Sequence, residues 1–197
     1  MPQTQRIITA NDILPLADYV AIRKERRSAL VQKKKHRRVH VGPDATAYFE
    51  NFETMQAQIQ EMLYIEKGGD EQLEDELRAY NPLIPQGREL VCTFMIEIDD
   101  PVRRLNTLLK LGGIENHVFF QFGAHKIMAR PEEDVERTTA DGKTSSVHFF
   151  HFDFTDAQIA EFKSGEHPVL FGCDHPQYSH LSGLSEDARA ALAADFG

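Results

Sequence analysis

Two histidines stand within a phenylalanine-rich stretch, KTSSVHFFHFDFT, at residues 143–155. The pattern predicts a strand, in which successive side chains point to opposite faces. His148 therefore shares one face with Phe150, whereas His151 lies on the opposite face with Phe149. We expect His148 to point into the core, where an imidazole needs partners for its ring nitrogens. Two interpretations follow: a structural, hydrogen-bonded histidine, or a ligand or acid–base group.

Glu66 is a second candidate, because it lies at the end of a predicted amphipathic helix over residues 53–67. The apolar stripe of this helix includes Ile59 and Leu63, and helical spacing places Glu66 near its centre. The negative end of the helix dipole also disfavours a carboxylate in the last turn. A core-facing Glu66 would need a cation, a metal or a network of donors. Alternatively, the helix frays and the side chain reaches water.

Glu97 lies in the predicted strand GRELVCTFMIEIDD, on the face opposite Ile96. It is solvated if one face of the sheet is open to water, and buried if both faces are covered. His175 and His180 occur in CDHPQYSH, which we interpret as an irregular segment after a final strand. Loop histidines of this kind usually lie on the surface.

Histidines and carboxylates from separate elements are the ligands of nonheme metal centres. We therefore predict His148, Glu66, Glu97 and His151 as candidate ligands for iron, manganese or zinc. HExxH and helical ExxH motifs are absent from the sequence. The two cysteines form no CxxC pair, and no GxSxG, phosphate-loop or dinucleotide motif occurs.

The charge of the chain is unevenly distributed. Residues 1–40 hold ten Lys/Arg and three Asp/Glu, whereas residues 41–197 hold twelve and twenty-eight. The run KKKHRR supplies five cations that are candidates for contact with an acidic partner or an anion: Lys33, Lys34, Lys35, Arg37 and Arg38. The acidic surface of this fold or of a second copy is an equally good partner, which makes a homodimer one possibility. A solvated helix end is the simpler interpretation, and nucleic-acid binding is disfavoured because no accompanying motif occurs.

The elements that position these residues alternate irregularly along the chain. A helix is predicted from Leu16 to about Arg37, followed by two strands, RRVHV and TAYFE, around the turn GPDA. HVFFQFGAHKIMA, at residues 117–129, is interpreted as one strand, and the acidic segment PEEDVERTTADGK as a loop. We predict a single α+β domain over residues 1–197, with a mainly antiparallel or mixed sheet packed with helices. Residues 1–40 would form its basic helical N-terminal extension.

No apolar run is long enough to cross a bilayer, and the N-terminus lacks the sections of a signal peptide. We therefore expect a cytoplasmic protein.

Several ordered blocks resemble a known family. They are RRVHVGPDATAYFEN, TMQAQIQEMLYIE, YNPLIP, TFMIEID, TSSVHFFHF and DHPQY, and they cover nearly the whole chain. This order is similar to that of the bacterial family called domain of unknown function 3501. The resemblance implies a small cytoplasmic protein, often encoded near rubrerythrin-like and iron–sulfur proteins, which would be possible redox partners. It implies no catalytic residue.

Two functions fit these observations. The first is a nonheme metal-binding or redox-associated protein with an internal His/Glu site, in which His148 and Glu66 line a pocket. The second is a non-catalytic accessory or ligand-binding protein that docks on a redox partner through its basic N-terminal helix. Whether the protein is an enzyme is left open by the sequence.

Overall fold

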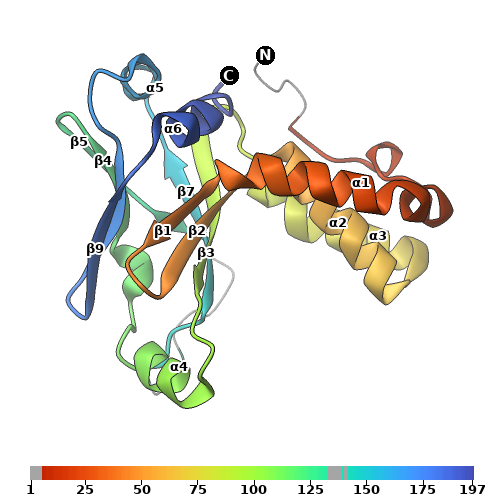
Figure 1. Cartoon of the computed structure of the whole chain (residues 1–197), viewed down its shortest axis with the longest axis horizontal. Coiled ribbons are helices and arrows are strands. Elements are labelled where there is room, and N and C mark those ends of the chain that lie inside the picture. The colour runs from red at the N-terminus through yellow and green to blue at the C-terminus, as the bar shows by residue number, and fades with distance from the viewer. Residues whose placement is uncertain (1–5, 133–138, 140–141) are drawn as a thin grey trace.

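The computed structural model describes residues 6–132, 139 and 142–197, and these residues form an α+β fold (Figure 1). One sheet has five strands in the order β1-β2-β3-β7-β6, and the other has four in the order β5-β4-β8-β9. Every strand pairing is antiparallel, as expected. The strands are β1 Arg38–Val41, β2 Ala45–Glu50, β3 Glu89–Ile96, β4 Val118–Phe122, β5 His125–Met128, β6 Arg130–Pro131, β7 Val147–Asp153, β8 Leu170–His175 and β9 Tyr178–Gly183.

The two sheets pack face to face around a core rich in phenylalanine. Phe120 of β4 lies at its centre, with ring centroids 5.5 Å from Phe49 and 4.9 Å from Phe152. Edge-to-face ring pairs such as Phe120 and Phe152 add to the free energy gained from burial. The alternation predicted for β7 is confirmed, because His148, Phe150 and Phe152 are all fully buried.

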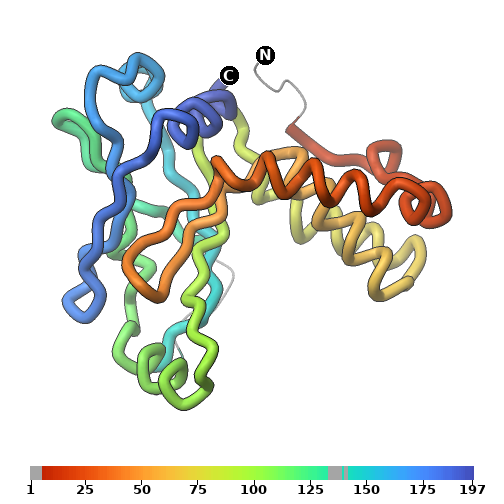
Figure 2. The backbone as a smooth tube through the Cα atoms, viewed as in Figure 1, coloured from red at the N-terminus to blue at the C-terminus, as the bar shows by residue number. Residues whose placement is uncertain are grey.

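The α-helices are α1 Leu16–Lys35, α2 Phe52–Glu66, α3 Gly69–Tyr80, α4 Pro101–Leu108, α5 Asp156–Ser164 and α6 Glu186–Ala193. Short 3-10 helices cover Ala10–Asp12 (η1), Asn81–Leu83 (η2) and Ile114–Asn116 (η3). Helices α1, α2 and α3 extend sideways from the sheets, and we call these three helices the arm (Figure 2). No described helix is both long and apolar enough to pass through a bilayer.

The arm joins the sheets through a second hydrophobic cluster. Met55 and Ile59 of α2 pack with Leu83 and with Val91 of β3 in this cluster. Helix α2 begins directly after β2, where Asn51 and Thr54 form a reciprocal capping box. The sharp turn from strand to helix therefore places α2 over the outer face of the five-stranded sheet.

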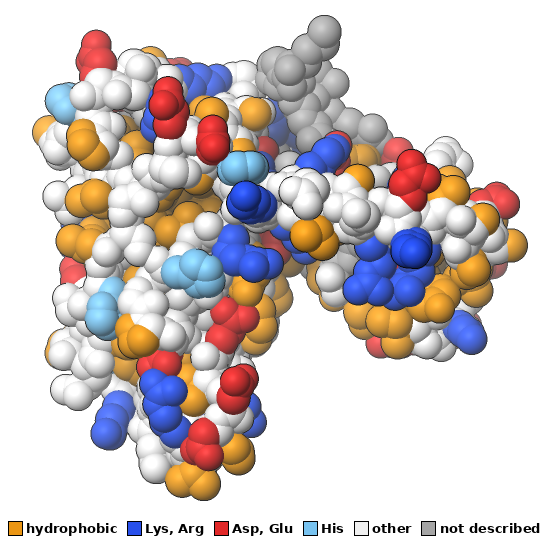
Figure 3. All heavy atoms as spheres, viewed as in Figure 1, with side chains coloured by type: hydrophobic (Ala, Val, Ile, Leu, Met, Phe, Trp, Pro, Cys, Tyr) orange, Lys and Arg blue, Asp and Glu red, His pale blue; other side chains and the backbone are white. Residues whose placement is uncertain are grey.

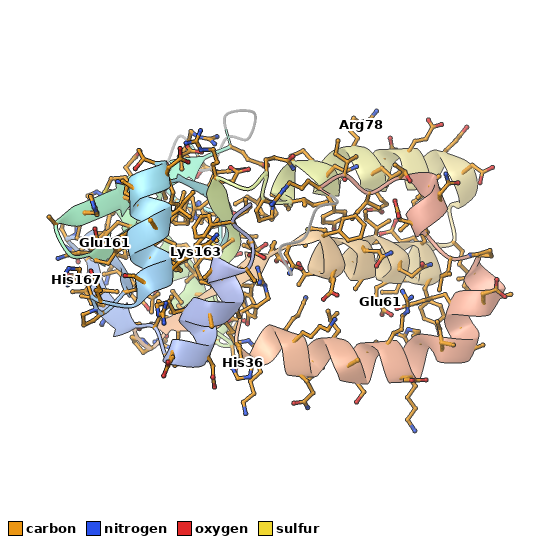
Figure 4. The ribbon with its side chains drawn as sticks, turned by 90° about the horizontal axis from the view of Figure 1, so that it is seen from above. His36, Glu61, Arg78, Glu161, Lys163 and His167 are labelled. Carbon is orange, nitrogen blue, oxygen red and sulfur yellow. The ribbon has the colours of Figure 1, made fainter. Side chains whose placement is uncertain are left out.

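Helix α1 is held to α2 by polar contacts. Glu61 of α2 accepts hydrogen bonds from Arg23 at 2.8 and 2.7 Å and from the hydroxyl of Tyr19 (Figure 4). Lys33 forms an ion pair with Glu53 at 2.7 Å. Tyr19 is the one buried residue of α1, and a cavity of about 280 Å³ lies between the two helices.

Arg37 fixes the base of the arm. Its guanidinium donates to the carbonyl oxygens of Phe49 and Glu50, both at 3.0 Å, and to that of Ala191 at 3.1 Å. It also pairs with the carboxylate of Asp195 near the C-terminus. Both side chains are buried, and burial raises the pKa of Asp195 although Arg37 opposes that shift. One side chain therefore joins the end of α1, the end of β2 and the C-terminal segment.

Two segments differ from the sequence-based interpretation. Residues 117–129 form the hairpin of β4 and β5, which turns at Gly123 with a positive φ of 50°. CDHPQYSH is part of a second hairpin, with His175 in β8 and His180 in β9. Short turns interrupt both apolar patterns without a strong turn signal. Most of the predicted acidic loop, residues 133–138 and 140–141, and the first five residues of the predicted extension lie outside the described residues.

We predict that Arg37→Ala lowers the free energy of unfolding by about 3–5 kcal/mol, because it leaves the buried carboxylate of Asp195 without its cation. Lys35→Ala is the matched control, since this neighbouring cation is exposed. It should change the free energy of unfolding by less than about 0.5 kcal/mol. Urea denaturation measures both variants, and equal losses would contradict the role given to Arg37.

We also predict that acid releases α1 from α2. The hydrogen bond from Arg23 lowers the pKa of Glu61 below its ordinary value of 4.5, so the ionised form stabilises the folded arm. This stabilisation is present above pH 4.5 and is lost as the pH falls through the lowered pKa. Amide exchange, corrected for intrinsic rates, should accelerate in α1 at acid pH but not in β3. In Glu61→Gln the exchange of α1 should already be fast at neutral pH, and slow exchange there would count against this prediction.

Candidate ligand-binding pocket

A pocket of about 340 Å³ lies between the outer face of the five-stranded sheet and the arm. The sheet supplies its floor and the helices supply its walls. Pockets of this size, lined by apolar and aromatic side chains with a few polar groups, are typical of small-molecule sites. The lining residues are Lys34, Tyr48, Glu50, Met55, Gln58, Tyr80, Leu83, Thr93, Met95 and Phe149.

The register of the sheet sets the floor of the pocket. Tyr48 of β2 lies opposite Thr93 of β3, which in turn lies opposite Phe149 of β7. These three side chains form one row across the outer face, because paired residues of neighbouring strands point the same way. All three are half-buried. The intervening residues of each strand, such as Phe150, point into the core instead.

Helical residues form the walls. Met55 and Gln58 come from α2, and the amide of Gln58 donates to the hydroxyl of Tyr80 at 3.4 Å. Leu83 follows in η2, where Pro82 lies in the first turn of the short helix. Lys34 reaches the pocket from the last turn of α1 and is half-buried. Three α-helices, the short helix η2 and three strands therefore contribute to the pocket.

Glu50 is the chemically unusual member of the lining. It is 6% exposed, and its carboxylate accepts a hydrogen bond from the hydroxyl of Thr93 at 2.9 Å. Among the described residues, no cation lies within ion-pair distance of this carboxylate. A buried charge is costly unless a cation and several donors compensate it. Lys34 lines the same pocket but is not within ion-pair distance of Glu50.

The side chains of the pocket suit an organic cation. Tyr80 and Phe149 offer aromatic faces, which attract ammonium groups through the ring quadrupole, whereas the ring of Tyr48 already has the guanidinium of Arg38 over it. Glu50 offers an acceptor with a full negative charge, and hydrogen bonds to charged groups are stronger than neutral ones.

The thiol of Cys92 takes no part in this chemistry, because it is fully buried and desolvation raises its pKa well above the ordinary value.

The structure separates the two histidines predicted as ligands. His148 lies between the sheets, where its Nε2 donates to the carbonyl of Ser145 at 2.9 Å and lies 3.3 Å from the hydroxyl of Thr144. His151 lies on the outer face and donates from Nδ1 to Glu89 at 2.9 Å. The two imidazoles therefore lie on opposite faces of the sheet and bond to different partners.

The two predicted carboxylate ligands also lie apart. Glu66 does not face the core: it is exposed in the last residue of α2, where it accepts a hydrogen bond from Gln72 at 3.0 Å. Glu97 is exposed beyond the end of β3 and accepts one from Tyr48 at 2.8 Å. Within the described parts of the chain, no group of three or more His, Cys, Asp or Glu side chains has the arrangement to hold a metal ion.

The predicted basic run divides among several environments. Lys33 pairs with Glu53, Lys34 lines the pocket, and Lys35 is exposed. Arg37 is buried and bonded within the chain, so its guanidinium is not available to a partner. Arg38 is exposed, and its guanidinium lies 5.0 Å from the ring centroid of Tyr48.

Sequence reasoning missed Glu50 although a signal was present. The strand TAYFE was predicted, and its alternation places Tyr48 and Glu50 on the face opposite Phe49. A glutamate on a strand is usually solvated, however, and only the packing of α2 and α3 over this face buries it. The pocket therefore depends on contacts between segments that are distant in sequence.

We predict that Glu50→Gln raises the free energy of unfolding by roughly 1 kcal/mol, because it removes the buried charge and keeps the hydrogen bond from Thr93. Thr93→Val should lower it by about 1–3 kcal/mol, since Glu50 then loses its one hydrogen-bond donor among the described residues. Glu71→Gln, an exposed glutamate on α3, is the control and should have little effect. Chemical denaturation gives all three values, and a destabilised Glu50→Gln would show that this carboxylate supports the fold.

Comparisons with known proteins identify the family of the chain. A crystal structure titled as a novel protein of unknown function from Burkholderia pseudomallei K96243 is similar, with a TM-score of 0.89 and 37% sequence identity. The similarity covers 96% of this chain and 99% of that one. A comparison with curated proteins gives no match. The model of the family described as "Protein of unknown function (DUF3501)" matches residues 7–196, so the chain belongs to the DUF3501 family.

Proposed function

We propose that this protein binds a small organic ammonium compound in the pocket beneath the arm, with Glu50 as its counter-charge. The observation that carries the proposal is the buried carboxylate of Glu50, which faces a pocket and pairs with no cation among the described residues. The proposal corresponds to the ligand-binding interpretation of the sequence.

The energetics of Glu50 support a cationic ligand. A carboxylate in this position is unfavourable in the empty pocket, where one hydroxyl is its hydrogen-bond donor among the described residues. An ammonium group placed beside it would supply both the missing charge and N–H donors. Binding of the ligand would therefore offset the free-energy cost of the buried charge, so the charge of Glu50 would contribute to affinity.

The aromatic side chains that line the pocket indicate that the same ligand also carries an apolar group. Tyr48 and Phe149 flank Thr93 on the floor, and Met55 and Met95 add flexible apolar surface. A ring or short alkyl chain would lie against these side chains while its ammonium group reached Glu50. Lys34 would oppose the ligand through like-charge repulsion, because it lines the same pocket.

Isothermal titration calorimetry with benzylammonium chloride tests the proposal, with benzyl alcohol as the neutral control of similar shape. Wild-type protein should bind the ammonium compound and not the alcohol. Glu50→Gln should weaken binding by about 10- to 100-fold, the effect of losing a hydrogen bond to a charged group.

Lys34→Met separates charge recognition from simple filling of an apolar pocket. It removes the competing cation and keeps a flexible side chain, so it should strengthen binding of benzylammonium. The proposal is wrong if the alcohol binds as well as the ammonium compound, or if Glu50→Gln binds as well as the wild type.

A further inference from the structure

The arm carries opposite charges at its two ends. Helix α3 starts at the outer end of the arm and contains five Asp/Glu and one Arg. Helix α1 ends where the arm meets the sheets, and its last turn contains Lys33, Lys34 and Lys35. Figure 3 shows Lys and Arg side chains gathered at this junction. The arm therefore has an acidic tip and a basic base.

Several of these charges have no counter-ion in the part of the chain that the structure describes. At the tip, Asp70, Glu71 and Glu74 are exposed and form no ion pair with any described residue. At the base, the same holds for Lys35 and Arg38. Exposed charges that share a chain often neutralise one another, but the length of the arm keeps these two groups apart (Figure 2).

Helix α1 contributes little to the hydrophobic packing of the described residues. Neither hydrophobic cluster of buried residues includes a side chain of this helix. Val20 and Val31 are 52% and 64% exposed, and helical spacing places them on one side of the helix together with Lys24 and Arg27. A helix of 20 residues depends mainly on tertiary packing for its stability in water, so burial of these two valines against a partner would stabilise it.

We propose that two copies of this chain associate through their arms in antiparallel orientation. A two-fold axis then brings the acidic tip of each arm against the basic base of the other, because residue i meets residue j at both contacts of an isologous interface. The exposed valines of the two α1 helices lie between these contacts. A head-to-tail arrangement would satisfy only one contact per copy and would leave the chain open to further addition.

Charge reversal at each end tests this arrangement. The base variant is Lys35→Glu with Arg38→Glu, and the tip variant is Glu71→Lys with Glu74→Lys. Each should be monomeric by sedimentation velocity at low ionic strength, with dimerisation weakened at least about tenfold, because both contacts become repulsive. An equimolar mixture should form a heterodimer, in which both contacts are again between opposite charges. This restoration also shows that both variants are folded.

Lys110→Glu with Lys163→Glu is the matched control, because these exposed lysines lie outside the arm. The control variant should dimerise as the wild type does. A wild-type protein that stays monomeric at every concentration would overturn the proposal. So would variants that remain dimeric alone, or a mixture in which they stay apart, since each result would exclude pairing between tip and base.

Discussion

The buried guanidinium of Arg37 is the contact on which the arrangement of the arm depends. It binds the carbonyl oxygens of Phe49 and Glu50 and the carboxylate of Asp195, so it holds the end of α1 against β2 and the C-terminal segment. The same contact fixes the backbone of Glu50, whose side chain points to the outer face of the sheet. One buried cation thereby sets both the direction of the arm and the position of the proposed counter-charge.

The two faces of the five-stranded sheet serve different purposes. The inner face meets the second sheet in a dense phenylalanine core, in which His148 is bonded to the backbone of Ser145. The outer face is covered incompletely by the arm, which leaves a pocket with a buried carboxylate. Stability comes mainly from the first face, so the second is free to hold a charge that lowers stability in the absence of a ligand.

Much of the fold could be predicted from the sequence, because alternation and capping are local signals. The inward orientation of His148 followed from the strand period, and the turn GPDA correctly placed the break between β1 and β2. The two later hairpins were not predicted, since their turns carry weak signals. The residues of the site were harder to predict. Helical periodicity placed Glu66 on the apolar stripe of α2, whereas the last turn of this helix is exposed to solvent. The burial of Glu50 depends on how the arm packs over the sheet, which no local pattern encodes.

The central claim is that an ammonium group enters the pocket and lies beside Glu50, and methionine methyl NMR measures this most directly. Met55 and Met95 line the pocket, whereas Met62 and Met128 do not and serve as internal references. Titration of methyl-labelled protein with benzylammonium chloride should shift the signals of Met55 and Met95 in the wild type, and the same shifts in Glu50→Gln should need about 10- to 100-fold more ligand. Equal shifts in that variant at the same ligand concentration, or shifts confined to Met62 and Met128, would contradict the account.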